Sequence, residues 1–308
     1  MLADRRGWAF DAAARGIRTA LAGQVDIRIA YTVEEPDLAS WDYDLIYQMW
    51  WKGSYQKKFT TKARDVIKQI SSHRWAQVRY GGLSVKGLMR RHLTDASTYT
   101  VPSQRLQREL SEHVTVHVTP KGFDPELLYD QQHRHGGELA IGWVGKASDP
   151  AKGLQDVILP GAGTRPVRVA DGCLTQREMC DFYNAVDVIC VGSSAEGDPR
   201  PLIEGMAAGC FVIATDVGIV PELVRHGGNG LIVERTPAAF ARAFEWCEER
   251  IDHVRAAGRH NAAQMLSTRT WAHVAPAWRD AIMAAYEKRV VLDLRRPRPR
   301  PQRARRRY

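Results

Sequence analysis

VICVGSSAEGDPRPLIEGMAAGCFVIATDVGIV, residues 188–220, reads as strand, loop, helix and strand. Val188–Val191 is a short β-branched run, which is typical of a buried parallel strand. Residues 192–200 carry Gly, Ser, Asp and Pro and therefore form a loop. Pro201 suits the first turn of a helix, where a missing N–H costs nothing. With Phe211–Ala214 as the next strand, the stretch predicts one βαβ unit of an open α/β sheet.

Two carboxylates in this unit are eight residues apart, Glu196 in the loop and Glu204 near the helix start. Open α/β sheets bind ligands at loops that leave the carboxyl ends of parallel strands. The following helix start offers free N–H groups and a positive dipole end, which suit a phosphate. Spacing alone leaves two interpretations. One is a nucleotide site whose carboxylates accept hydrogen bonds from sugar hydroxyls, and the other is an ordinary strand–helix unit with a capping acid.

The segment EGDPRPLIEGMAAGCFVIATDVGIVPELV, residues 196–224, resembles the signature of family-4 glycosyltransferases, a large retaining group with the GT-B fold. That signature has Glu, seven residues, Glu, a small-residue helix, a strand and a Pro-Glu turn. The residues in register are Glu196, Gly197, Glu204, Gly209, Pro221 and Glu222. The resemblance implies two Rossmann-like α/β domains with a cleft between them and a C-terminal helix that crosses back to the first domain.

The resemblance also implies a donor site for a nucleotide sugar, with UDP-glucose favoured. Lys146 and Lys152 would bind the diphosphate, Glu196 the hydroxyls of the sugar and Glu204 the ribose, while Glu222 is interpreted as structural. Two cations on a diphosphate offset the charge that grows on the leaving group, which is how such a site would accelerate transfer. The expected donor-binding residues are Gly7, Gly145, Lys146, Lys152, Glu196, Gly197, Arg200, Pro201, Leu202 and Glu204.

His73 ends a first-domain strand in ISSHRW, where the family often has a His that faces the donor sugar. The expected catalytic residues are therefore His73, Lys146, Lys152 and Glu196, in a retaining hexosyltransferase without a protein nucleophile. We expect no metal and no cofactor besides the donor. Asp42-Tyr43-Asp44 imitates the DxD of the other large glycosyltransferase fold, but it lies at a strand start with no third ligand in sight.

Length predicts two domains for the 308 residues, at 1–135 and 136–293, followed by a disordered Arg/Pro tail at 294–308. Gly7-Trp8 stands where the family's first glycine loop follows its first strand, so that strand is expected to be missing. The stretch 120–129 resembles the family's interdomain segment, with Lys121 in place of the usual Asn. Further strands are predicted at 25–31, 44–49, 97–101, 115–119, 139–144, 167–170 and 231–233, and helices at 1–24, 63–69, 103–110, 175–186, 238–250, 253–266 and 271–290. Residues 84–92 are predicted as a basic helix or loop.

Positive charge is concentrated in two segments. Residues 50–91 hold eleven Lys/Arg against one acid, and residues 294–308 hold eight Arg and no acid, within a net charge of +9. Such segregation indicates an anionic partner, although a solubilising face and tail would look the same. The expected acceptor-binding residues are Trp50, Trp51, Lys52, Tyr55, Lys57, Lys58, Arg74, Arg79, Arg90 and Arg91.

Cations interleaved with aromatics fit phosphates and an extruded base, or an anionic membrane. The Arg/Pro tail, which lacks apolar residues to insert into lipid, favours double-stranded DNA with 5-hydroxymethylcytosine as acceptor, as in phage-type DNA glycosyltransferases. The alternative is a membrane lipid or surface-polysaccharide acceptor, and a third hypothesis is a catalytically dead DNA-binding module. Five cysteines without a CxxC pair and the lack of a signal-peptide core predict a cytoplasmic protein, in the host cytoplasm if it is phage-encoded.

Overall fold

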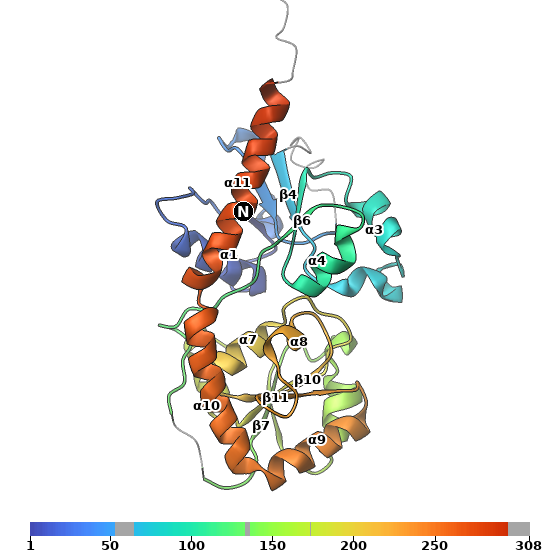
Figure 1. Ribbon diagram of the computed structural model, residues 1–308, viewed down its shortest axis with the longest axis vertical. Helices are drawn as coiled ribbons and strands as arrows, with labels where there is room; N and C mark the ends of the chain where they lie inside the picture. The colour runs from blue at the N-terminus through green and yellow to red at the C-terminus, as the bar shows by residue number, and fades with distance from the viewer. Residues whose placement is uncertain (53–64, 133–135, 173, 295–308) are drawn as a thin grey trace, which may run out of the picture.

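The computed structural model describes residues 1–52, 65–132, 136–172 and 174–294, and it contains two parallel sheets stacked end to end along the long axis (Figure 1). We call the first sheet and its helices the first half, and the second sheet and its helices the second half. Among the described residues, no helix is long and apolar enough to cross a membrane. The described cysteines, Cys180, Cys190, Cys210 and Cys247, are buried and form no disulfide with one another.

The first half has six parallel strands in the order β2-β1-β3-β4-β5-β6. The strands are β1 (Leu2–Ala3), β2 (Ala30–Tyr31), β3 (Ile46–Gln48), β4 (Val66–Gln69), β5 (Thr98–Val101) and β6 (Val116–Val118). The α-helices are α1 (Ala9–Ala20), α3 (Val85–His92) and α4 (Gln104–Ser111). Short 3-10 turns at 73–76 and 78–80 follow β4 and carry the chain toward the second half.

The first strand, expected to be missing, is present as β1. Leu2 pairs with Ala30 on one side and with Gln48 on the other, so β1 lies inside the sheet. Leu2 and Ala3 are both buried. Two residues are enough for a strand here because neighbouring strands on both sides satisfy its backbone. The sequence pattern missed it because so short a run shows no periodicity.

The predicted helix at 63–69 is wrong where the structure describes it, because Val66–Gln69 form β4. Lys68 and Gln69 resemble exposed helix residues in sequence, yet both side chains are buried. The Lys68 ammonium donates to the His92 carbonyl at 2.8 Å and to the Asp95 carboxylate. These partners lie more than twenty residues away in the sequence. Their hydrogen bonds offset the cost of burying the Lys68 ammonium in a central strand.

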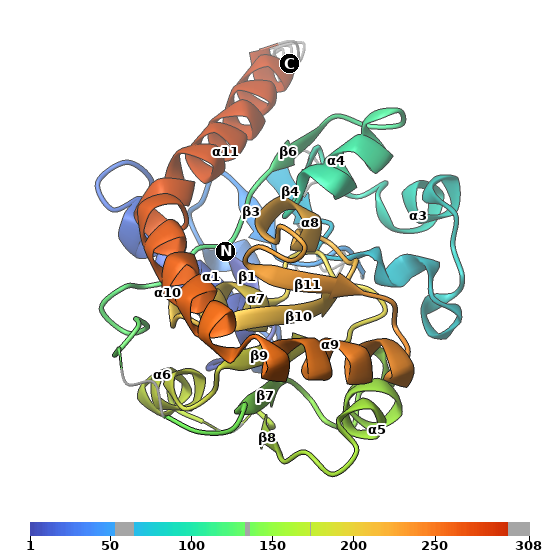
Figure 2. The same cartoon turned by 60° about the horizontal axis from the view of Figure 1, so that its bottom comes forward.

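The second half has five parallel strands in the order β11-β10-β9-β7-β8. The strands are β7 (Ile141–Val144), β8 (Val167–Ala170), β9 (Val188–Val191), β10 (Phe211–Thr215) and β11 (Gly230–Val233). The α-helices are α5 (Leu159–Ala162), α6 (Gln176–Asn184), α7 (Arg200–Ala207), α8 (Val220–Leu223), α9 (Pro237–Glu249) and α10 (Ile251–Thr268). Figure 2 shows these helices around the sheet. The sheet matches the predicted strands closely because its inner strands β9 and β10 are fully buried apolar runs, whereas β8 at the edge is partly exposed.

The last helix, α11 (Trp271–Leu294), leaves the second half and runs beside α1, as expected (Figure 1). Its residues Trp271, Trp278 and Ile282 join Ala13 and Ile17 in one core. The Trp278 indole N–H donates to the Pro120 carbonyl at 2.7 Å. The expected boundary at 135 falls on residues 133–135, and the tail beyond Leu294 falls on 295–308, both outside the described residues.

Candidate active site

The carboxyl ends of β7 and β9 bring two loops of the second half together. Gly153 ends the 3-10 turn Pro150–Lys152 with a φ of +76°, and a Cβ there would lie 2.2 Å from the Gly192 carbonyl oxygen. The Ser194 N–H donates to the Ala151 carbonyl at 2.8 Å. A residue with a side chain would therefore force the loops apart at Gly153. This close approach carries Lys152 to the loop that holds Glu196.

Lys152 and Glu196 form an ion pair at this point, with 2.5 Å between Nζ and Oε1. The Ser193 hydroxyl donates to the same carboxylate oxygen at 3.1 Å. The side chains of Lys152 and Glu196 are 23% and 12% exposed, so both retain a path to solvent. Burial opposes ionisation of Glu196, but Lys152 and Arg74 outweigh it, and the pKa of this carboxyl is lowered from its ordinary value. Glu196 is therefore an anion at neutral pH, able to accept hydrogen bonds from hydroxyl groups.

Glu204 lies on α7 and uses both carboxylate oxygens. The Arg200 guanidinium pairs with Oε1, and the Tyr183 hydroxyl donates to Oε2 at 2.8 Å. Since a carboxylate can accept about four hydrogen bonds, each oxygen can still accept one from a ligand. Arg200, expected to bind the donor directly, instead orients the carboxylate.

The remaining donor-site predictions divide. Lys146 is exposed just after β7 and Gly145, on the same edge as Lys152. Gly7 lies in the loop between β1 and α1, where its φ of +74° suits a glycine, and its N–H donates to Asp11. Leu202 does not fit, because its side chain is fully buried and its N–H donates to the Pro199 carbonyl at 3.1 Å. Pro201 beside it has no N–H, so this part of α7 offers a phosphate fewer donors than expected.

Gly197 is one of the residues at which the two halves touch. It forms an antiparallel bridge with Ser72 at the end of β4, and a Cβ on Gly197 would lie 2.2 Å from the Ser71 carbonyl oxygen. Behind it, the Gly197 carbonyl accepts the Ile219 N–H at 2.8 Å. The loop that carries Glu196 is therefore held between the first half and α8, with no room for a side chain at Gly197.

We predict that Gly197→Ala separates the two halves and slows the sugar transfer that the sequence resemblance implies by about 100-fold, the cost of a displacement of about 1 Å at a reacting centre. Small-angle scattering would show a larger radius of gyration, and a transfer assay would show the rate. Gly87→Ala on α3 is the matched control, since its Cβ would meet its neighbours at an ordinary 3.5 Å. Equal shape and rate in Gly197→Ala and the wild type would contradict the prediction.

His73 faces the second half, as the sequence predicted. Its Nδ1 lies 3.3 Å from the Glu196 carbonyl oxygen, and its Nε2 lies 2.6 Å from Glu109 on α4. The imidazole thus bridges the first half to the loop that carries the Glu196 carboxylate. Glu109 was not singled out in the sequence, since nothing in its local pattern distinguishes it from a surface acid.

Arg74 and Arg79 were expected to bind the acceptor, and the structure directs them elsewhere. Both guanidinium groups pair with Asp149 of the second half, Arg74 at 2.9 Å and Arg79 at 2.8 Å. Asp149 lies between Lys146 and Lys152 in the sequence, and its role was not predicted. A pairing between residues 70 or more positions apart leaves no local signal. These arginines therefore contact the turn between Lys146 and Lys152 of the second half.

Other predicted acceptor residues are only partly available. Trp51 is 4% exposed and packs edge-on against Tyr80 and His92, so its ring cannot stack on a base. Trp50 is half-buried against Phe10. The exposed predicted cations that the structure describes are Arg79, which is paired with Asp149, Lys52, which lies over the Tyr80 ring, and Arg90 and Arg91 on α3. Tyr55, Lys57 and Lys58 lie outside the described residues.

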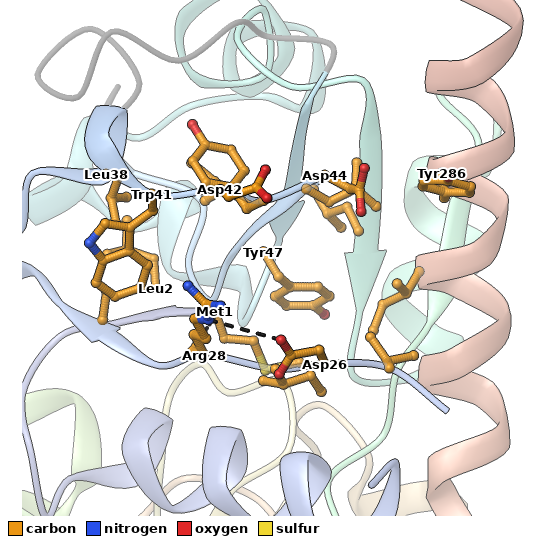
Figure 3. A pocket seen from close by; sticks show the side chains of 18 of the residues that line it. Met1, Leu2, Asp26, Arg28, Leu38, Trp41, Asp42, Asp44, Tyr47 and Tyr286 are labelled. Carbon is orange, nitrogen blue, oxygen red and sulfur yellow. Dashed lines mark hydrogen bonds and ion pairs between the residues drawn. The ribbon is translucent and has the colours of Figure 1, made fainter. Parts of the chain in front are cut away.

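A cavity of about 480 Å³ lies away from these groups, at the amino ends of the first-half strands (Figure 3). Tyr47 and Ile67 line it, together with Trp41 and, from α11, Tyr286. Asp42 and Asp44 stand at its border, and Asp44 pairs with Arg289 at 3.1 Å. Within the described ranges, no three His, Cys, Asp or Glu side chains are grouped as a metal site would require. This cavity lies at the opposite end of the first-half strands from His73 and the loop that carries Glu196.

Residues 112–249 match the family model of the glycosyl transferases group 1. D-inositol 3-phosphate glycosyltransferase of Mycolicibacterium smegmatis is 29% identical over 130 residues, which are 41% of this chain and 28% of the relative. Its counterpart in Streptomyces bingchenggensis is 41% identical over 69 residues, which are 22% of this chain and 15% of the relative. The matches therefore span less than a third of these curated relatives.

Solved structures resemble the chain over most of its length. Anabaena HepE in complex with UDP and glucose has a TM-score of 0.68 at 16% identity, covering 92% of this chain and 98% of that one. Sucrose-phosphate synthase of Thermosynechococcus elongatus has a TM-score of 0.62 at 19% identity, covering 83% and 76%. With two parallel-sheet Rossmann-like halves, the fold is that of the GT-B glycosyltransferases, as the sequence predicted.

Proposed function

We propose that this chain, whose residues 112–249 match the glycosyl transferases group 1 model, moves a hexosyl group from a nucleotide sugar to a hydroxyl acceptor. The observation that carries the proposal is the Lys152–Glu196 pair at the carboxyl edge of the second sheet, with Glu204 on the helix that follows. A cation beside two carboxylates complements a diphosphate joined to two polyhydroxylated groups. An ordinary strand–helix unit would not need a charged pair that is largely buried.

In this proposal the ion pair opens when donor binds. Lys152, with Lys146, turns to the diphosphate, and Glu196 accepts hydrogen bonds from the sugar. Glu204 takes a ribose hydroxyl, and His73 faces the sugar from the first half. The bond between C1 and the β-phosphate oxygen breaks, and the acceptor oxygen bonds to C1 on the same face. The acceptor proton passes to the departing phosphate, so the configuration is retained without a protein nucleophile or a metal ion.

UDP-glucose is the proposed donor. Anabaena HepE, which shares the fold, has been solved in complex with UDP-glucose. Fold likeness at 17% identity does not carry the donor over, so the nucleotide is part of the test.

For the acceptor we propose a hydroxyl on an anionic molecule, with 5-hydroxymethylcytosine in double-stranded DNA tested first. The exposed cations Arg90, Arg91 and Lys86 on α3, and eight arginines after Leu294, support an anionic partner. The buried Trp51 removes one predicted stacking platform. A membrane lipid or surface polysaccharide is the alternative, and the name of the curated relatives adds a phosphorylated inositol.

The test measures transfer of label from radiolabelled UDP-glucose by purified protein. The acceptors are a hydroxymethylcytosine duplex, D-inositol 3-phosphate and anionic lipid vesicles, with binding measured at rising salt. Label on the duplex, with binding that weakens steeply with salt, supports DNA. Label on inositol phosphate or lipid replaces DNA by that acceptor. If the protein neither transfers nor hydrolyses UDP-, GDP- or ADP-linked glucose, the proposed activity is wrong.

A further inference from the structure

One cluster of ion pairs where the two halves meet holds more cations than carboxylates. The cluster consists of Arg74, Arg79 and Lys152 against Asp149 and Glu196, all joined by ion pairs. Three cations face two carboxylates, so one positive charge has no counterpart within the cluster. Arg79 is half exposed to solvent, but the side chains of Arg74 and Lys152 are only 19% and 23% exposed, so an anion that enters the cluster meets two partly buried cations, which favours its binding.

Arg74 is the cation whose geometry fits that ligand. Its Nη1 donates to Asp149 at 2.9 Å and to the Tyr80 hydroxyl at 3.2 Å, which fixes the plane of the guanidinium. Its Nη2 lies 4.0 Å from Glu196 Oε1, too far for a hydrogen bond. Lys152 and Ser193 already bind that same oxygen. The Nη2 group therefore lies near the Lys152–Glu196 pair and can still donate hydrogen bonds to a ligand.

We propose that Arg74 is a donor-binding residue supplied by the first half, which contacts the β-phosphate of the nucleotide sugar and is held in place by Asp149 and Tyr80. The inference rests on the proposed function, because it takes Glu196 to bind the sugar and Lys152 to bind the diphosphate. The junction of sugar and β-phosphate then lies between these two side chains, within reach of Nη2. Arg74 joins the diphosphate to the first half, so donor binding and contact between the halves reinforce each other.

A simple latch between the halves is a different role, and the chain offers a comparison. Arg105 of α4 also pairs across the halves, with Asp216 at 2.8 Å, and its N–H donates to Glu222. Arg105 has no contact with Lys152 or Glu196 among the described residues. Arg79 shares Asp149 with Arg74 but is 51% exposed, against 19% for Arg74. If the arginines only hold the halves together, substitution of any of the three should affect nucleotide binding similarly. If Arg74 binds the phosphate, its substitution should have the largest effect.

The experiment compares the affinities for UDP and UMP by titration calorimetry in the wild type, Arg74→Gln, Arg79→Gln and Arg105→Gln. Loss of a charge-assisted hydrogen bond to the β-phosphate is expected to weaken UDP binding by Arg74→Gln by about 10- to 100-fold. UMP lacks that phosphate, so its affinity should be unchanged. Arg79→Gln and Arg105→Gln should weaken UDP binding less than Arg74→Gln does. If thermal unfolding shows that Arg74→Gln is not folded, Arg74→Lys replaces it, with a smaller loss that is again confined to UDP.

Unchanged UDP affinity in Arg74→Gln would overturn the inference, and so would an equal loss for UDP and UMP. A loss in Arg105→Gln as large as that in Arg74→Gln would assign both residues to the latch and would also overturn it. The proposed function stands in all three cases, since the wild type binds UDP in each. If the wild type binds neither UDP nor GDP nor ADP, both the proposed function and the inference fail.

Discussion

Glu196→Gln lowers the rate of sugar transfer by about 100- to 1,000-fold, the expected cost of removing one well-placed charged contact in an active site. The amide keeps the shape of the side chain but loses the negative charge that balances Lys152 at 2.5 Å. It also replaces an oxygen that accepts hydrogen bonds by a nitrogen that donates them. Lys152→Ala removes the other member of the pair and should lower the rate by a similar factor.

Transfer from radiolabelled UDP-glucose measures both rates, and thermal unfolding checks that each variant is folded. Glu222→Gln is the matched control. Its carboxylate accepts the Arg105 N–H at 3.2 Å, in contact with the first half and outside the Lys152–Glu196 pair. Wild-type turnover in folded Glu196→Gln would mean that the site is elsewhere.

Lys121→Met destabilises the protein by about 3 to 5 kcal/mol, because it leaves a buried carboxylate without its partner. The Lys121 ammonium lies 2.6 Å from Asp198 Oδ1, and the two residues are 7% and 3% exposed. Burial already raises the pKa of Asp198 although Lys121 lies beside it. Denaturant unfolding gives the free energy. Lys86→Met on α3 removes an exposed lysine and should change that free energy by less than about 0.5 kcal/mol.

A second substitution separates the lost charge from lost packing. Asp198→Asn in the Lys121→Met background removes the unpaired charge and keeps an oxygen for the Lys121 backbone N–H, which Asp198 accepts at 3.2 Å. The double variant should therefore regain most of the stability. If the double variant is as unstable as Lys121→Met, packing of the lysine stem carries the effect. Wild-type stability in Lys121→Met would contradict the prediction altogether.

The second half was predictable because its sequence and its environment agree. Val188–Val191 and Phe211–Thr215 are apolar, and the structure buries them as parallel strands. Thr175 caps α6 through a capping box with Glu178, which their spacing indicates. Local chemistry and tertiary position point the same way in these elements.

The first half was harder to predict because its partners lie far away in the sequence. Lys68 belongs to a buried strand only because Asp95 and the His92 carbonyl receive its ammonium. From the sequence, Arg74 and Arg79 were assigned to a basic surface. In the structure both pair with Asp149, which is 75 residues from Arg74. Lys121 stands where the family usually has Asn. The structure explains this difference, because the Lys121 ammonium pairs with Asp198, 77 residues later in the chain. The sequence shows that such residues are charged, but it does not show which distant residue each of them pairs with.

The docking of α11 on α1 sets an order in which the protein can be made. Trp271, Val274, Trp278 and Ile282 belong to the same core as Ala13 and Ile17, near the other end of the chain. When the first half leaves the ribosome during synthesis, the α11 residues that complete its core have not yet been made. The apolar face of α1 therefore stays without this cover until α11 has been made and has left the ribosome, and until then it is open to association with other chains.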